Sequence, residues 1–141
     1  MSSMKKDDID SVYRIEIEVN RNPWSKENFI SSFDSPHVYS FVVRLHNAII
    51  GFIIFSIIRD EFSILDVALA QKFQGIGYGR SLFSQVHSYA LDHGARSAYL
   101  EVSNQNKRAI NFYTKQGYGI CGQRPKYYAN EDDALLMRRT L

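Results

Sequence analysis

The sequence lacks the paired cysteines, the histidine spacing and the strong positive net charge that are typical of disulfide-bonded, metal-binding and nucleic-acid-binding proteins. Its one cysteine, Cys121, cannot form a disulfide within the chain, and we expect it to be a small, buried apolar side chain. The four histidines show no ligand spacing such as H-x-x-x-H, so no metal site is expected. The net charge of +2 is too small to indicate nucleic-acid binding, which usually requires a clustered basic surface.

Membrane and secretion signals are also missing. The longest apolar run, AIIGFIIFSII at 48–58, is too short to cross a bilayer and predicts a buried strand. The polar N-terminal stretch MSSMKKDDID is not followed by the apolar region of a secretory signal. We therefore expect a cytoplasmic protein without membrane association. With 141 residues, of which 45% are hydrophobic, residues 1–141 suit one globular domain.

Hydrophobic periodicity predicts helices and strands along the whole chain. The first half should contain two short helices, then three strands joined by turns at 46–48 and 59–61, as in an antiparallel meander. The second half alternates strand and helix, and its first crossover should be a right-handed βαβ unit with parallel strands. This predicts an α/β (α+β mixed) fold with a central mixed, mostly antiparallel sheet, a parallel βαβ core and helices on both faces. The expected helices are 8–19, 26–33, 79–92 and 106–116, and the expected strands are 38–45, 49–58, 62–69, 97–102, 118–122 and 134–139.

Capping residues support these boundaries. Ser25 and Asn106 each precede an expected helix and can accept a hydrogen bond from its first turn. Gly94 and Gly117 follow expected helices, where glycine commonly ends a helix in a left-handed conformation.

The stretch FQGIGYGRSLF at 73–83 has glycine at positions 75, 77 and 79, just before an expected helix. A glycine-rich turn at a helix N-terminus presents several backbone N–H groups and favours an anion, best of all phosphate. A dinucleotide-binding loop would need glycine where Arg80 stands, and a P-loop would need an earlier glycine where Gln74 stands. A flexible loop without a ligand is the other alternative, and three glycines at one helix start make it the weaker one.

A third pattern, Q-x-x-G-x-G at 74–79, resembles the pyrophosphate-binding loop of the GNAT superfamily of acetyl-CoA-dependent N-acetyltransferases. The segment YLEV at 99–102 and the pattern N-x-x-A-I-x-x-Y-x-x-x-G-Y at 106–118 are similar to the second half of that family's cofactor site. Pro-Trp-Ser at 23–25 and R-x-x-Y-Y…D-A-x-x-M at 124–137 resemble the ribosomal-protein-alanine N-acetyltransferases, the RimI group. The resemblance covers almost the whole chain and implies a single GNAT-like domain.

The resemblance implies that acetyl-CoA is the co-substrate. The end of the strand at 62–69 should hydrogen-bond its pantetheine arm and thioester through the backbone, and the loop should bind its pyrophosphate. The residues implied in cofactor binding are Val67, Ala68, Leu69, Gln74, Gly75, Ile76, Gly77, Tyr78, Gly79, Arg80 and Asn106.

Two residues are candidates for proton transfer. Glu101 lies between apolar neighbours in a strand that we expect to be buried on both faces, where an unpaired carboxylate is costly. The RimI-like context L-E-V implies that it is a general base working through water; the alternative is a structural ion pair, for example with Arg96. Tyr113 matches the GNAT tyrosine that protonates the coenzyme A thiolate, although its position alone would favour a core tyrosine.

The same resemblance bears on the acceptor. Tyr127 and Tyr128, together with Trp24, are candidates to line a slot for a peptide N-terminus, and an ordinary packed loop is about as consistent with the sequence. RimI-like proteins usually have an acidic residue or a histidine, followed by proline, where this chain has Ala70-Gln71. Asp66 stands where asparagine is common in that group. These two differences leave the specificity for the acceptor open. The leading hypothesis is acetylation of a protein N-terminus. The alternatives are a small amine such as a polyamine or aminoglycoside, and a non-catalytic acetyl-CoA-binding regulator.

Overall fold

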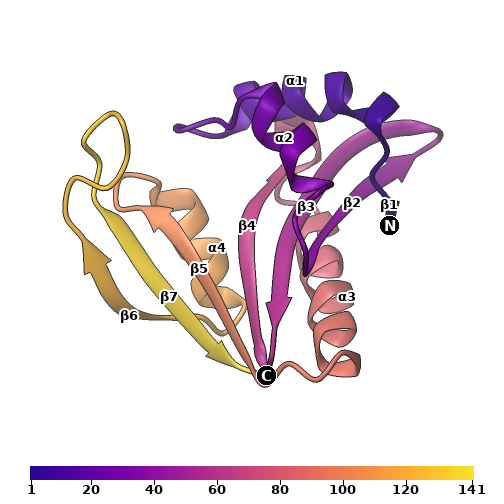
Figure 1. Cartoon of the computed structure of the whole chain (residues 1–141). Coiled ribbons are helices and arrows are strands. Elements are labelled where there is room, and N and C mark those ends of the chain that lie inside the picture. The colour runs from indigo at the N-terminus through magenta and orange to yellow at the C-terminus, as the bar shows by residue number, and fades with distance from the viewer.

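The computed structural model describes all 141 residues as seven strands, four α-helices and two short 3-10 turns (Figure 1). From α1 to β7 the order of helices and strands agrees with the sequence prediction, with boundaries shifted by one or two residues. The helices are α1 (Ile9–Val19), α2 (Lys26–Ser32), α3 (Tyr78–Asp92) and α4 (Lys107–Lys115), and the 3-10 turns are Lys6–Asp8 and Gln71–Phe73. The strands are β1 (Ser2–Ser3), β2 (Val38–Leu45), β3 (Ala48–Ile58), β4 (Glu61–Leu69), β5 (Ser97–Ser103), β6 (Gly119–Arg124) and β7 (Ala134–Thr140).

The seven strands form one mixed sheet in the order β1-β2-β3-β4-β5-β7-β6. Strands β2, β3 and β4 are an antiparallel meander, as predicted. The crossover β4–α3–β5 makes β4 and β5 parallel, and every other pair is antiparallel. The predicted fold class is therefore confirmed. The short strand β1, which pairs with β2, was not predicted because two polar serines carry no strand pattern.

Helices cover both faces of the sheet, and each face has its own core. On one face α1 and α2 pack on β2, β3 and β4, with Val12, Phe29 and Phe52 fully buried. On the other face α3 and α4 pack on β3, β4 and β5 around Phe55 and Phe83. Strand β3 is buried over most of its length because it is covered from both sides.

Strands β4 and β5 separate halfway along their length (Figure 1). They pair only from Glu61 opposite Ser97 to Ile64 opposite Leu100. Beside β3, Phe55 pairs with Ile64 and Ile54 with Asp66, so Leu65 is an extra residue that makes a bulge. The bulge bends β4 away from β5, and this separation creates the space for the site described below.

The predicted caps are present. Ser25 Oγ accepts a hydrogen bond from Asn28 N at 3.2 Å, and Asn106 Oδ1 accepts one from Ala109 N at 3.2 Å. Gly94 and Gly117 have φ values of 89° and 92°, the left-handed conformation expected after α3 and α4. No helix of the structure is long and apolar enough to cross a membrane.

The expected burial of Cys121 is wrong, because its side chain is exposed. It lies on β6, which is the edge strand of the sheet. The register between β6 and β7 shifts from Ile120 to Gly122, so Cys121 is the residue left without a partner. An edge strand with one uncovered face gives a small apolar side chain nothing to pack against.

His87 gives the fold a dependence on pH. It is buried, it shares a 2.8 Å hydrogen bond with Tyr118 Oη through Nε2, and its Nδ1 accepts one from Arg139 Nη1 at 3.1 Å. Burial, and then the charge of Arg139, lower the pKa of His87 to about 4. An unfolded histidine has a pKa of about 6.5. Between these values the unfolded chain binds a proton that the folded chain does not, so stability is lost as pH falls.

We expect the free energy of unfolding to drop between about pH 6.5 and pH 4, and His87→Gln to make this drop smaller. Urea unfolding at pH 7 and pH 5 measures it. The matched control is His93→Gln, because His93 is exposed at the end of the same helix. Equal pH dependence of the two variants would contradict the assignment.

Candidate active site

A cavity of about 120 Å³ lies where β4 and β5 separate, and we call it the strand cavity. Its walls come from four places: the segment after α1, the ends of β4 and β5, α4, and the loop between β6 and β7. The residues that line it are Asn20, Arg21, Asn22, Trp24, Ile64, Leu65, Asp66, Val67, Leu100, Glu101, Val102, Ser103, Asn106, Tyr113 and Tyr128.

A larger groove of about 450 Å³ runs from the end of β4 between α3 and α4, and we call it the loop groove. It contains most of the residues that the sequence assigned to the cofactor; Ile76 and Tyr78 do not line it, and the Ile76 side chain is exposed to solvent. The lining residues are Val19, Asn20, Val67, Ala68, Leu69, Gln71, Gln74, Gly75, Gly77, Gly79, Arg80, Leu82, Phe83, Asn106, Arg108, Ala109, Asn111, Phe112, Tyr113 and Lys115.

The two spaces meet. Asn20, Val67, Asn106 and Tyr113 line both of them. A molecule lying in the loop groove can therefore present its end to a second molecule in the strand cavity. Such an arrangement suits transfer of a group between two substrates, because it holds the reacting atoms together.

The glycine loop is built to bind an anion. Gly75 and Gly77 have φ values of 77° and 106°, which other residues rarely adopt. The backbone N–H groups from residue 75 to 80 have no hydrogen-bond partner in the chain, and those of α3 carry the partial positive charge of a helix N-terminus. Arg80, Arg108 and Lys115 add positive charge to the same groove.

Gln74 has a structural role in this loop. Its Nε2 donates a 2.8 Å hydrogen bond to Leu69 O and so ties the loop to the end of β4. Gly79 permits a close approach of α3 to α4, since a Cβ there would lie 3.1 Å from the ring of Phe112. These contacts position the loop and the two helices that flank the groove.

Replacement of Gly77 should weaken acetyl-CoA binding. The Gly77→Ala variant forces a left-handed conformation on a residue with a Cβ, at a cost of about 1–3 kcal/mol. Relaxation of that strain would turn the N–H groups away from the anion, so we expect the Kd for acetyl-CoA to rise about tenfold. Isothermal titration calorimetry with acetyl-CoA measures this Kd in the variant and in the unaltered protein.

Gly94→Ala is the matched control for this prediction. Like Gly77, Gly94 has a positive φ, and a Cβ at either position would have no neighbouring atom within 4 Å. Gly94 differs in its location, because it lies at the far end of α3 and outside the loop groove. The variant should lose stability and keep its affinity for acetyl-CoA. Equal weakening of binding in both variants would show that Gly77 acts only through stability.

Tyr113 lies on α4 at the junction of the two spaces, where its ring stacks on Phe83 with centroids 5.8 Å apart. Burial raises the pKa of the Tyr113 hydroxyl above its usual value, and repulsion from Asp66 and Tyr128 in their ionised forms would raise it further. The hydroxyl therefore keeps its proton at neutral pH and is able to donate it.

Glu101 lines the strand cavity, but the expected burial on both faces is wrong. Its side chain is partly exposed, at 32%, and its Oε1 lies 3.6 Å from Arg124 Nε, so the partner is not Arg96. Strand β5 alternates between a buried face with Leu100 and Val102 and an open face with Glu101. The open face is uncovered because α1 and α2 pack on β2, β3 and β4 and do not extend over β5.

Of the three aromatic residues expected around the acceptor, two line the strand cavity. Trp24 packs on Phe29 with centroids 5.2 Å apart, and Tyr128 is half-buried with its pKa raised to about 12, mainly by burial and then by Glu101. Tyr127 is exposed and lies outside the cavity, with its ring 5.5 Å from the guanidinium of Arg124.

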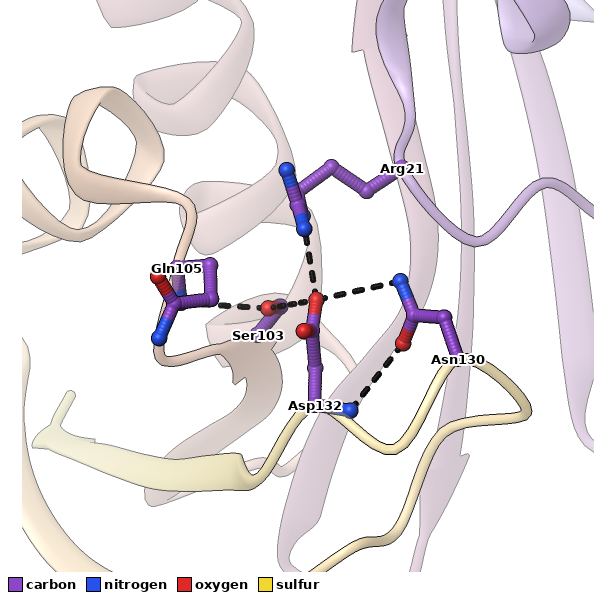
Figure 2. A network of polar contacts seen from close by, with 5 residues as sticks. All are labelled: Arg21, Ser103, Gln105, Asn130 and Asp132. Atoms are coloured by element: carbon purple, nitrogen blue, oxygen red, sulfur yellow. Dashed lines mark hydrogen bonds and ion pairs between the residues drawn. The ribbon is translucent and has the colours of Figure 1, made fainter.

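Asp132 joins the two segments that carry these aromatic walls (Figure 2). Its Oδ2 accepts hydrogen bonds from Arg21 Nε at 3.0 Å, Ser103 Oγ at 2.7 Å and Asn130 Nδ2 at 3.2 Å. These hydrogen bonds, with the one from Ser103 the most important, lower the pKa of Asp132, so it remains ionised. The segment after α1 and the β6–β7 loop are thereby fastened to the end of β5.

Sequence reasoning missed Asn20 and Glu16. Glu16 is fully buried in α1, and Asn20 ends that helix and lines both spaces. A glutamate on the apolar face of an amphipathic helix was the available signal, because such a position is costly for a charge without partners.

Comparisons with known proteins agree on one family. The model of the acetyltransferase (GNAT) family matches residues 9–118. A Bacillus subtilis protein with the provisional name ribosomal protein bS18-alanine N-acetyltransferase is 30% identical over 99% of this chain and 93% of its own. The crystal structure of the Escherichia coli ribosomal-protein-S18-alanine N-acetyltransferase is 26% identical, with a TM-score of 0.88 over 99% of this chain and 91% of the other.

A third relative was solved with the co-substrate. It is a Bacillus anthracis protein with the provisional name streptothricin acetyltransferase, in complex with acetyl coenzyme A. It is 26% identical, with a TM-score of 0.71 over 80% of this chain and 68% of the other. The family match covers most of the chain, and the loop groove offers N–H groups and cations suited to the phosphates of that molecule. The chain belongs to the acetyltransferase (GNAT) family and is an acetyl-CoA-dependent N-acetyltransferase of the RimI type.

Proposed function

We propose that this protein acetylates the N-terminal α-amine of a protein, with a ribosomal protein as the acceptor. The observation that carries the proposal is the strand cavity, which opens beside Glu101 and meets the loop groove at Tyr113. Its aromatic walls, Trp24 and Tyr128, suit an extended peptide end. The names of the Bacillus subtilis and Escherichia coli relatives, which act on the alanine of a ribosomal protein, support the same acceptor.

The roles proposed for the side chains follow from their positions. Glu101 is open to water, so it accepts a proton from the incoming ammonium group through a water molecule and leaves a neutral amine. The amine nitrogen forms a bond to the thioester carbonyl carbon, and the bond from that carbon to sulfur breaks. Tyr113 donates its proton to the departing sulfur and regains one from solvent. The second amine proton is released to water when the amide forms.

The contacts of Asp132 predict that its replacement weakens binding of the peptide acceptor and leaves binding of acetyl-CoA unchanged. Asp132→Ala frees the two segments that carry Trp24 and Tyr128, so we expect the KM of a peptide acceptor to rise about fivefold while the Kd of acetyl-CoA stays the same. Steady-state kinetics and calorimetry measure the two constants. Asp10→Ala is the matched control, because Asp10 forms a 3.0 Å ion pair with Lys26 away from the cavity. An unchanged peptide KM in Asp132→Ala would contradict the role.

A panel of acceptors tests the proposed function. The purified protein is incubated with acetyl-CoA and short peptides that differ in their first residue, and thiol release and peptide mass are followed. We expect a mass gain on peptides with free N-termini and none on N-terminally blocked copies. Thiol release with polyamines or aminoglycosides alone would instead establish a small-amine acetyltransferase. Binding of acetyl-CoA without turnover of any amine would favour a regulator.

A further inference from the structure

A pair of carboxyl groups lies between α1 and β4, and the proton transfers described above do not use it. Glu16 is fully buried, and both of its oxygens accept hydrogen bonds: Oε1 from Asn20 Nδ2, and Oε2 from Trp24 N at 3.0 Å. Asp66 Oδ1 accepts from Asn20 Nδ2 at 3.0 Å and from Val67 N at 3.0 Å. The last oxygen, Asp66 Oδ2, is buried and has no donor.

The two carboxyl groups are close neighbours because the amide nitrogen of Asn20 donates to both of them. Neither forms an ion pair with a lysine, arginine or histidine. Two buried carboxylates without a cation are too costly to be ionised together, so the pair retains one proton. Three of the four oxygens already accept N–H groups, which leaves Asp66 Oδ2 to carry it. Burial, and then hydrogen bonding to Glu16 and its charge, raise the pKa of Asp66 well above its usual value.

The remaining negative charge lies on Glu16, directly behind the wall of the strand cavity, and no cation lies beside it. Asp66, Asn20 and Trp24 line the cavity. The other charged groups there have partners of their own: Glu101 on β5 lies near Arg124, and Arg21 is bound to Asp132. Tyr113 from α4 and Tyr128 from the β6–β7 loop are uncharged, since burial is the main cause that raises the pKa of both hydroxyl groups.

We propose that Glu16 and Asp66, joined by Asn20 and sharing one proton, form the site that attracts and binds the positively charged ammonium group of the acceptor. The inference rests on the proposed function, because it concerns an amine that enters the strand cavity. A cation beside the pair supplies the missing countercharge, and Trp24 and Tyr128 offer aromatic faces that also favour a cation. Once bound, the ammonium group gives up its proton by the route through Glu101.

The binding of a peptide to the protein–CoA complex tests whether the pair attracts a positively charged amine. This measurement requires no turnover. A short peptide with a free N-terminus and its N-terminally acetylated copy are titrated into the protein saturated with CoA. We expect the free amine to bind at least about tenfold more tightly, and the Glu16→Gln/Asp66→Asn double variant to lose this difference. Asp66→Asn alone should lose less, because Glu16 keeps its charge. An unchanged Kd for CoA shows that the variants are folded.

Carbon-13 NMR titration of the side-chain carboxyl groups in the unaltered protein tests the shared proton without any ligand. We expect one carboxyl of the pair to titrate well above the usual range, and this titration to disappear in Asp66→Asn. Two ordinary titrations, or a double variant that still prefers the free amine, would overturn the inference. A protein that acetylates no peptide would overturn the proposed function, whereas the NMR titration would still decide on the pair.

Discussion

Glu101→Gln is expected to lower kcat about 100-fold, the size of a typical general-base contribution, while the Kd of acetyl-CoA stays the same. Glutamine has nearly the same shape and can still contact a water molecule, but it cannot accept the proton of the ammonium group. The exposed position of Glu101 at the strand cavity favours this role, because a carboxylate that works through water needs access to it. Steady-state kinetics with a peptide acceptor measure kcat, and calorimetry measures binding.

Glu61→Gln is the matched control. Glu61 is also an exposed glutamate on a central strand, but it lies at the paired end of β4, away from both the strand cavity and the loop groove. It should leave kcat unchanged. If Glu101→Gln turns over as fast as Glu61→Gln, the amine loses its proton elsewhere and the proposed base is wrong.

Tyr113→Phe is expected to lower kcat by a similar factor, about 100-fold, because a phenyl ring cannot donate a proton to the departing sulfur. The ring stacks on Phe83, so phenylalanine should keep the packing and the protein should stay folded. Thiol release measured at saturating acceptor gives kcat, and thermal unfolding checks stability.

Tyr99→Phe serves as its control. The Tyr99 hydroxyl accepts a 3.3 Å hydrogen bond from Arg138 and lies on neither the strand cavity nor the loop groove. Its loss should not affect turnover. A Tyr113→Phe variant with normal kcat would mean that solvent protonates the sulfur and that Tyr113 only fills space.

The fold could be predicted from the sequence because its signals are local. Alternation over 38–45, a long apolar run at 48–58, the caps Ser25 and Asn106, and the glycines after α3 and α4 each report on neighbouring residues. The glycine loop was recognisable for the same reason: its positive φ angles require glycine at fixed positions. The bulge at Leu65 has no such signal, although it creates the space at the site.

Side-chain environments at the site depended on contacts between distant segments, so they were harder to predict. Glu101 has apolar neighbours in sequence, which suggested burial, but α1 and α2 leave its face of β5 uncovered. In the sequence, Asp66 was only an aspartate at a position where asparagine is common. The packing of α1 on β4 is what places Glu16 beside it. Tyr127 and Tyr128 are adjacent in sequence, yet only Tyr128 faces the strand cavity.

The most direct test of the central claim is to locate the acetyl group on a peptide that offers two amines. The peptide carries a free N-terminus and one internal lysine, and its fragments are analysed by mass spectrometry after incubation with the protein and acetyl-CoA. The proposed function predicts that the α-amine alone gains the acetyl group. Acetylation of the lysine side chain, or an unmodified peptide in the presence of an active small-amine acceptor, would contradict the assignment of this protein as an N-terminal acetyltransferase.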